Sequence, residues 1–183
     1  MTVAGLIAVL MLAALPIAAQ KTRREVVNAA KDPADDAKGL SSKVPDVYAV
    51  STQFERIVIL RFKFDTDLLA GLEKMIKQEN IQNAIIINGT GSVRGYQVHQ
   101  VSNRTFPSKN MMVKNPTQPA DIAGMSGFVV NGVLHAHITL AVPDHAFGGH
   151  LEPGTTVFTF AVVTLGVLKD GTDLTHLEDK SYR

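Results

Sequence analysis

Apolar runs of four to thirteen residues fill most of the chain between residues 47 and 168, and many of them alternate apolar with polar positions. Alternation with a period of two is typical of strands that bury one face. Strands are therefore predicted at 47–50, 54–64, 83–88, 95–101, 122–130, 133–142 and 155–168. A short strand is predicted at 111–113, inside a long loop at 103–119. Gly89 to Val93 predict a tight turn or a bulge, and Asn131-Gly132 predicts a hairpin.

One segment has the period of a helix instead. Asp65 or Thr66 can cap its start, and it runs to about Asn80. Its apolar positions lie on one helical face: Leu68, Leu69, Leu72, Met75 and Ile76. Because such a face must be covered, we expect it to pack on the predicted strands. The fold class that follows is α+β, a mostly antiparallel sheet packed against one or two helices in a single domain.

The ends of the chain differ from this central part. Residues 1–19 are almost entirely apolar, with Pro16 and two alanines before Gln20, which is the order of a cleaved signal peptide. The alternative is an uncleaved membrane anchor. Residues 20–46 are polar and predict a flexible linker, 47–168 form the domain, and 169–183 form a polar tail. We expect an exported protein, periplasmic or extracellular, with no stable membrane span after cleavage.

The amino-acid composition excludes several kinds of functional site and partner. The chain has no cysteine, so disulfides, cysteine-ligated zinc and a thiol nucleophile are excluded. Lysine and arginine total 18 against 17 acidic residues, and this net charge of +1 gives no global field that would attract nucleic acid. No arginine-rich hook for the DNA minor groove occurs in the sequence. We therefore expect no nucleic-acid partner.

Histidine is the residue type whose positions indicate a functional site. Four of the six histidines lie between residues 135 and 150. His135 and His137 are two apart in a predicted strand, so their side chains project from the same face. The turn predicted at 143–150 adds His145 and His150, and its Gly148-Gly149 pair allows a close backbone approach. Zinc accepts three imidazoles and leaves a fourth position open.

The strongest predicted metal triad is His135, His137 and His150. Asp144 or Glu152 could bond the second nitrogen of a ligand. The alternative is that these histidines are hydrogen-bonded structural residues with no metal. His99 is interpreted as a surface strand residue, and His176 in the tail as incidental. No catalytic residue can be assigned from the pattern, and serine-hydrolase chemistry lacks a Gly-x-Ser-x-Gly elbow.

The sequence resembles the plant-and-prokaryote-conserved (PPC) domain over residues 47–168. The matching motifs are R-F at Arg61, G-T-G-S-V at Gly89, H-A-H at His135 and G-G-H-L-x-x-G at Gly148, with an apolar final strand after them. The resemblance implies a compact α+β domain that assembles as a homotrimer. It also implies a metal site at the same three histidines, with zinc as the expected metal. Where the family has an acidic segment, this chain has Ala120-Asp121-Ile122, so the role of Asp121 is open.

Two functions from different classes remain. The first is a trimeric binding module, with a small-molecule ligand possible, whose histidines hold a metal. The second is a metal-assisted hydrolase or lyase acting on a small molecule, with Asp144 or Glu152 moving protons. DNA binding is the weakest hypothesis.

Overall fold

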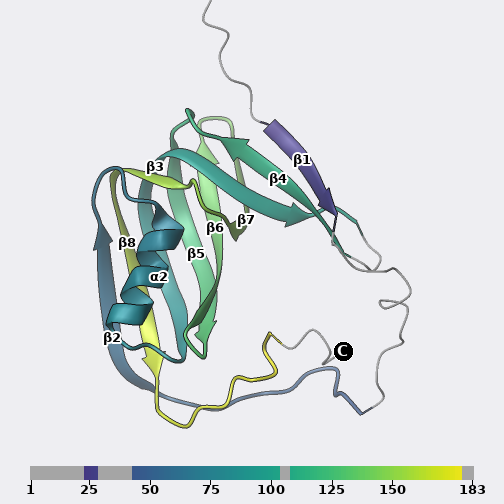
Figure 1. Ribbon diagram of the computed structural model, residues 1–183, viewed down its shortest axis with the longest axis vertical. Helices are drawn as coiled ribbons and strands as arrows, with labels where there is room; N and C mark the ends of the chain where they lie inside the picture. Colours follow the sequence, from purple (N-terminus) through teal and green to yellow (C-terminus); the bar gives the residue numbers. More distant parts are fainter. Residues whose placement is uncertain (1–22, 29–42, 104–107, 179–183) are drawn as a thin grey trace, which may run out of the picture.

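The computed structural model describes residues 23–28, 43–103 and 108–178, and its strands form one eight-stranded sheet in which every pairing is antiparallel. Figure 1 shows their arrangement. The strands are β1 (Arg23–Asn28), β2 (Phe54–Phe62), β3 (Ala84–Val101), β4 (Lys109–Asn115), β5 (Ala120–Val130), β6 (Val133–Val142), β7 (His145–Leu151) and β8 (Thr156–Leu168).

β3 is the strand around which the sheet is built. Its first half pairs with β5 on one edge and β8 on the other, and its second half continues with β4 and β7. β6 bridges β5 and β7, so the path β3–β5–β6–β7 returns to β3. This closure brings β6, β7 and the second half of β3 side by side. It is the part of the fold that carries the histidines.

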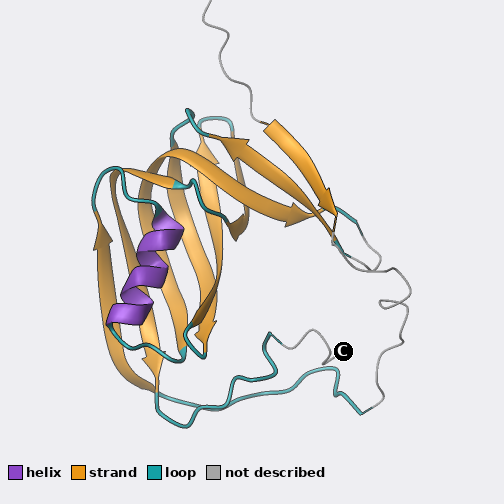
Figure 2. Cartoon of the chain, in the orientation of Figure 1, coloured by secondary structure: helices purple, strands orange, loops and turns teal. Residues whose placement is uncertain are grey.

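The helix α2 (Leu68–Gln78) lies against one side of the sheet, as Figure 2 shows. Asp67 caps it, accepting a hydrogen bond from the Ala70 amide at 3.0 Å. Leu68, Leu72 and Ile76 are buried on its inner face. They belong to one apolar core with Leu60, Leu165 and Ile138 of the sheet. Burying each such side chain contributes about 2 kcal/mol.

Most of the expected elements are present, and the α+β class with a mostly antiparallel sheet and one helix among the described residues is confirmed. Gly89 to Val93 form a bulged stretch inside β3, with register shifts and a positive φ at Gly91. The predicted 111–113 strand is the middle of β4. The cap at Asp65 or Thr66 was wrong, because Asp67 occupies the N-cap.

Two other expectations differ from the structure. Residues 47–50, predicted to be an edge strand, have no regular structure. The segment predicted as a turn at 143–150 contains the strand β7. Its glycines serve close strand packing: a Cβ on Gly148 would lie 2.5 Å from the Ile138 carbonyl oxygen, and one on Gly149 would lie 2.3 Å from that of His99.

The flanking segments carry further differences. β1 lies within the stretch expected to be a flexible linker, and it pairs with β4. The tail after β8 runs beside residues 43–53 at the lower edge of Figure 1. The proposed signal peptide, residues 1–19, lies outside the described residues. Among the residues that are described, no helix is both long and apolar enough to cross a membrane.

Candidate metal centre

His135 and His137 are placed by the alternation of β6. Their neighbours Ala136 and Ile138 are each only 2% exposed and face the core. The two histidines therefore point away from the core, on the same side of the strand. Their rings are stacked, with centroids 5.2 Å apart and planes within 9° of parallel, and 3.2 Å separates their Nε2 atoms. The predicted same-face pair is present.

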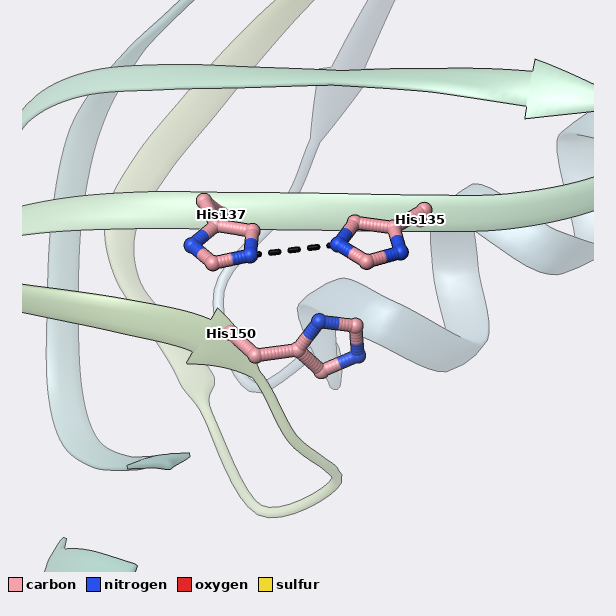
Figure 3. A group of neighbouring side chains, drawn as sticks. All are labelled: His135, His137 and His150. Atoms are coloured by element: carbon pink, nitrogen blue, oxygen red, sulfur yellow. Dashed lines mark hydrogen bonds between the residues drawn. The ribbon is translucent and has the colours of Figure 1, made fainter. Parts of the chain in front are cut away.

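His150 comes to this pair from β7, where it is the register partner of His137. Figure 3 shows its ring beneath the other two. The ring stands edge-on to both: the centroid distances are 4.7 Å to His135 and 5.4 Å to His137, with interplanar angles of 89° and 88°. The structure thus brings together the three residues predicted as a metal triad.

The donor set fits a metal ion. Each imidazole offers one nitrogen, and the three nitrogens lie within 4.8 Å of one another. A tetrahedral ion with metal–nitrogen distances near 2.0–2.1 Å requires nitrogens about 3.3 Å apart. The 3.2 Å between the Nε2 atoms of His135 and His137 is already that length. Among the described residues these three histidines are the group that could hold a metal ion.

Burial favours the neutral form of two of these imidazoles. It is the largest cause that lowers the pKa of His150 to about 4, with the neighbouring charges of His99, His135 and His137 acting in the same direction. Glu152 opposes this shift. Burial also lowers the pKa of His137, assisted by His135 and His99. Because a metal ligand must be unprotonated, these shifts favour metal binding.

His99 is the histidine that the sequence left outside the site. It is the register partner of His150 across β3 and β7, and the two rings stack at 4.6 Å between centroids. Its Nδ1 lies 2.5 Å from Oε1 of Glu152. Glu152 therefore bonds His99 and not one of the three predicted ligands. The two histidines are 51 positions apart in the sequence, and only the pairing of β3 with β7 brings them together.

The other acidic candidates lie elsewhere. Asp144 is 2.7 Å from Nδ1 of His145, and both side chains are exposed. That hydrogen bond is the main cause that lowers the pKa of Asp144. Asp121 is an exposed β5 residue that lines a groove of about 800 Å³ with Phe158 and Phe160. The carboxylate that does reach the triad belongs to Glu178, which pairs with Nδ1 of His135.

The sequence model of the Plants and Prokaryotes Conserved (PCC) domain matches residues 49–169. The chain belongs to this family. The resemblance based on the H-A-H and G-G-H-L motifs is thereby confirmed. No curated protein matches this chain.

Solved structures share the fold of this PCC domain. A metal-containing protein of Archaeoglobus fulgidus is 20% identical, with a TM-score of 0.56 over 67% of this chain and 86% of its own. A PPC protein of Pyrococcus horikoshii is 24% identical, with a TM-score of 0.57 over 67% and 85%. A Bacteroides thetaiotaomicron protein, named only as a candidate for DNA binding, is 20% identical, with a TM-score of 0.50 over 68% and 85%.

Proposed function

We propose that this chain is an exported, homotrimeric PCC-domain binding module that holds a zinc ion at His135, His137 and His150. The observation that carries the proposal is the convergence of three imidazoles from β6 and β7, with ligand nitrogens within 4.8 Å. Imidazole nitrogen is a ligand that suits zinc, although copper, nickel and iron also accept it. The absence of cysteine leaves an all-nitrogen donor set.

Elemental analysis of the purified protein tests the metal site. We expect about one zinc per chain in the wild type and little in His137→Ala or His150→Ala. His145→Ala is the matched control, because its exposed imidazole lies in the same segment but outside the triad. A wild-type protein that takes up no metal after loading with zinc would overturn the proposal. Equal zinc in all four proteins would place the metal elsewhere.

A zinc-dependent hydrolase or lyase is the second candidate function. It is favoured by the partial exposure of the triad, since 34% of the His135 side chain is open to solvent, and by the His99–Glu152 pair beside it. Zinc held by three histidines supplies a Lewis acid that activates water or polarises a carbonyl. Assays of esters, lactams, carbon dioxide and phosphates, with and without zinc, distinguish the two candidates. Zinc-dependent turnover that His150→Ala abolishes would establish the enzyme.

The trimer is supported by exposed apolar side chains on three adjacent strands. They lie on β2, β8 and β3 and are between 38% and 68% exposed: Ile57, Ile59, Phe158, Phe160, Ile85 and Ile87. Exposed apolar side chains on neighbouring strands are typical of a surface that contacts another protein. We take the partner to be further copies of the chain. Sedimentation equilibrium measures whether the mass in solution is three times that of one chain.

Export rests on the apolar residues 3–19, and a mature N-terminus at Gln20 found by mass spectrometry would support it.

DNA binding is the least favoured function, because the net charge is +1. The name of the Bacteroides protein keeps this function open to test. Salt-dependent retention on DNA would favour DNA binding, and we expect no such retention.

A further inference from the structure

The tail after β8 is anchored to the domain from Lys169, the last residue that the PCC family model matches, onward. The Lys169 amide donates to the Gln53 carbonyl at 2.9 Å, and the Asn83 side-chain amide donates to the Thr172 carbonyl at 2.9 Å. Leu174 is only 6% exposed and packs in a small apolar cluster with Val130 and Leu168. A buried leucine of this kind holds the segment in place by about 2 kcal/mol.

This anchored tail ends on the metal triad. Phe128 packs against the tail cluster and also stacks on His135, with ring centroids 5.1 Å apart and planes 19° from parallel. The carboxylate of Glu178 pairs with Nδ1 of the same imidazole. The His135 ring is therefore held on one face by an aromatic ring and at one edge by an acid.

The contact at Nδ1 determines which nitrogen of His135 can bind a metal. A carboxylate beside a neutral imidazole accepts the ring proton, which places that proton on Nδ1 and the lone pair on Nε2. Nε2 of His135 is the atom that faces His137 at 3.2 Å. The lone pair is then directed into the triad.

We propose that Glu178 is a positioning residue for the metal ligand His135, supplied by a C-terminal segment outside the matched residues 49–169. The proposal rests on the proposed metal-binding function. It deepens that function, because the tail and the metal become linked: a docked tail favours the metal-binding tautomer, and a bound metal favours the docked tail by the same factor.

The first experiment measures the imidazole itself in metal-free protein. Nitrogen-15 NMR distinguishes the two tautomers of a histidine. We expect His135 to carry its proton on Nδ1 in the wild type and to populate both tautomers in Glu178→Ala. Glu73→Ala is the control, since Glu73 is an exposed glutamate on α2. An unchanged His135 tautomer in Glu178→Ala would overturn the proposal, and this readout needs no metal.

The second experiment measures metal binding by competition with a chelator. Loss of such an outer carboxylate typically lowers metal affinity 10–100-fold. Because 40% of the Glu178 side chain is exposed, we expect about a 10-fold loss in Glu178→Ala and none in Glu73→Ala. Cobalt absorption spectra should change in Glu178→Ala, since the geometry at His135 changes. Leu174→Ser, which removes the anchor but keeps the acid, should give the same loss.

The outcomes separate the two proposals. Wild-type protein that binds no zinc overturns both the proposed function and the role of Glu178. Wild-type protein that binds zinc, with identical affinity and cobalt spectrum in Glu178→Ala, overturns the role of Glu178 alone. Zinc-dependent protection of residues 170–178 from hydrogen exchange, lost in Glu178→Ala, supports the linkage between tail and metal.

Discussion

The rings of His99 and His150 stack across β3 and β7, with centroids 4.6 Å apart and planes 27° from parallel. Glu152 pairs with Nδ1 of His99 and so holds the His99 ring in this stack. β3 and β7 pair over only two residue pairs, so the stack lies where β7 meets the rest of the sheet. His150 can therefore rotate little without losing its contact with His99. The position of the third proposed ligand depends on a residue that is not itself a ligand.

Replacing His99 should weaken metal binding without removing a ligand. We expect His99→Ala to lower zinc affinity about 10-fold, because His150 gains freedom that binding must remove. His99→Phe keeps a ring to stack on and should retain most of the affinity. Chelator competition measures both variants. Equal losses in the two variants would show that the bond to Glu152, and not the stack, positions His150.

The metal-free protein should lose stability as pH falls. An unfolded histidine has a pKa near 6.5, whereas burial lowers the pKa of His150 to about 4. Between these values the unfolded chain binds a proton that the folded chain does not bind. The contribution of His150 to the free energy of unfolding therefore falls from about pH 6.5 to about pH 4 and is constant below. His137, whose pKa is also lowered, adds to the decline.

Urea unfolding at several pH values measures this decline. His150→Gln keeps a polar side chain of similar size but cannot titrate, so its stability should depend less on pH over the same range. His145→Gln changes an exposed imidazole outside the triad and is the control. A pH dependence as steep in His150→Gln as in the wild type would contradict the assignment.

The local part of the site could be predicted from sequence. Two histidines separated by one residue in an apolar run must share a face of a strand, and the same rule buries Ala136 and Ile138. His150 was identified through the glycines before it and the family resemblance. Its strand was missed because Gly148 and Gly149 were interpreted as turn formers. In the structure they allow the carbonyls of β6 and β3 to approach closely.

The long-range part of the site had no local signal. His99 reaches the triad through the register of β3 with β7, which depends on how the sheet closes. Glu178 reaches it because Leu174, in a mostly polar tail, is buried. Two leucines, Leu174 and Leu177, among polar and charged residues do not distinguish a docked tail from a free one. Neither contact follows from the spacing of residues along the chain.

Two glycines of β5 provide a matched test of how closely β5 must approach β6, the strand that carries His135. Gly127 has a φ of 146°, and a Cβ there would lie 2.1 Å from the carbonyl oxygen of His135. Gly124 has no atom within 4 Å of its added Cβ. We expect Gly127→Ala to lower the free energy of unfolding by about 1–3 kcal/mol or more, because the backbone strain alone costs about that much.

Gly124→Ala should change the free energy of unfolding by less than about 0.5 kcal/mol. Thermal unfolding of both variants measures the difference. Because the Gly127 clash is with the backbone of the residue that carries a proposed ligand, Gly127→Ala should also lose zinc. Equal stability in the two variants would show that β5 can move away from β6 at little cost.

The apolar face on β2, β8 and β3 predicts how the trimer can be separated. Ile59 is 68% exposed and lies in the middle of β2, so an aspartate there should leave the isolated chain folded. Within a contact between copies, the same carboxylate would be buried without a partner, which costs several kcal/mol. We expect Ile59→Asp to sediment as single chains. Val133→Asp is the control, because Val133 is 70% exposed but begins β6, outside these three strands. A wild-type protein that is monomeric, or an Ile59→Asp variant that remains trimeric, would show that this face does not hold the copies together.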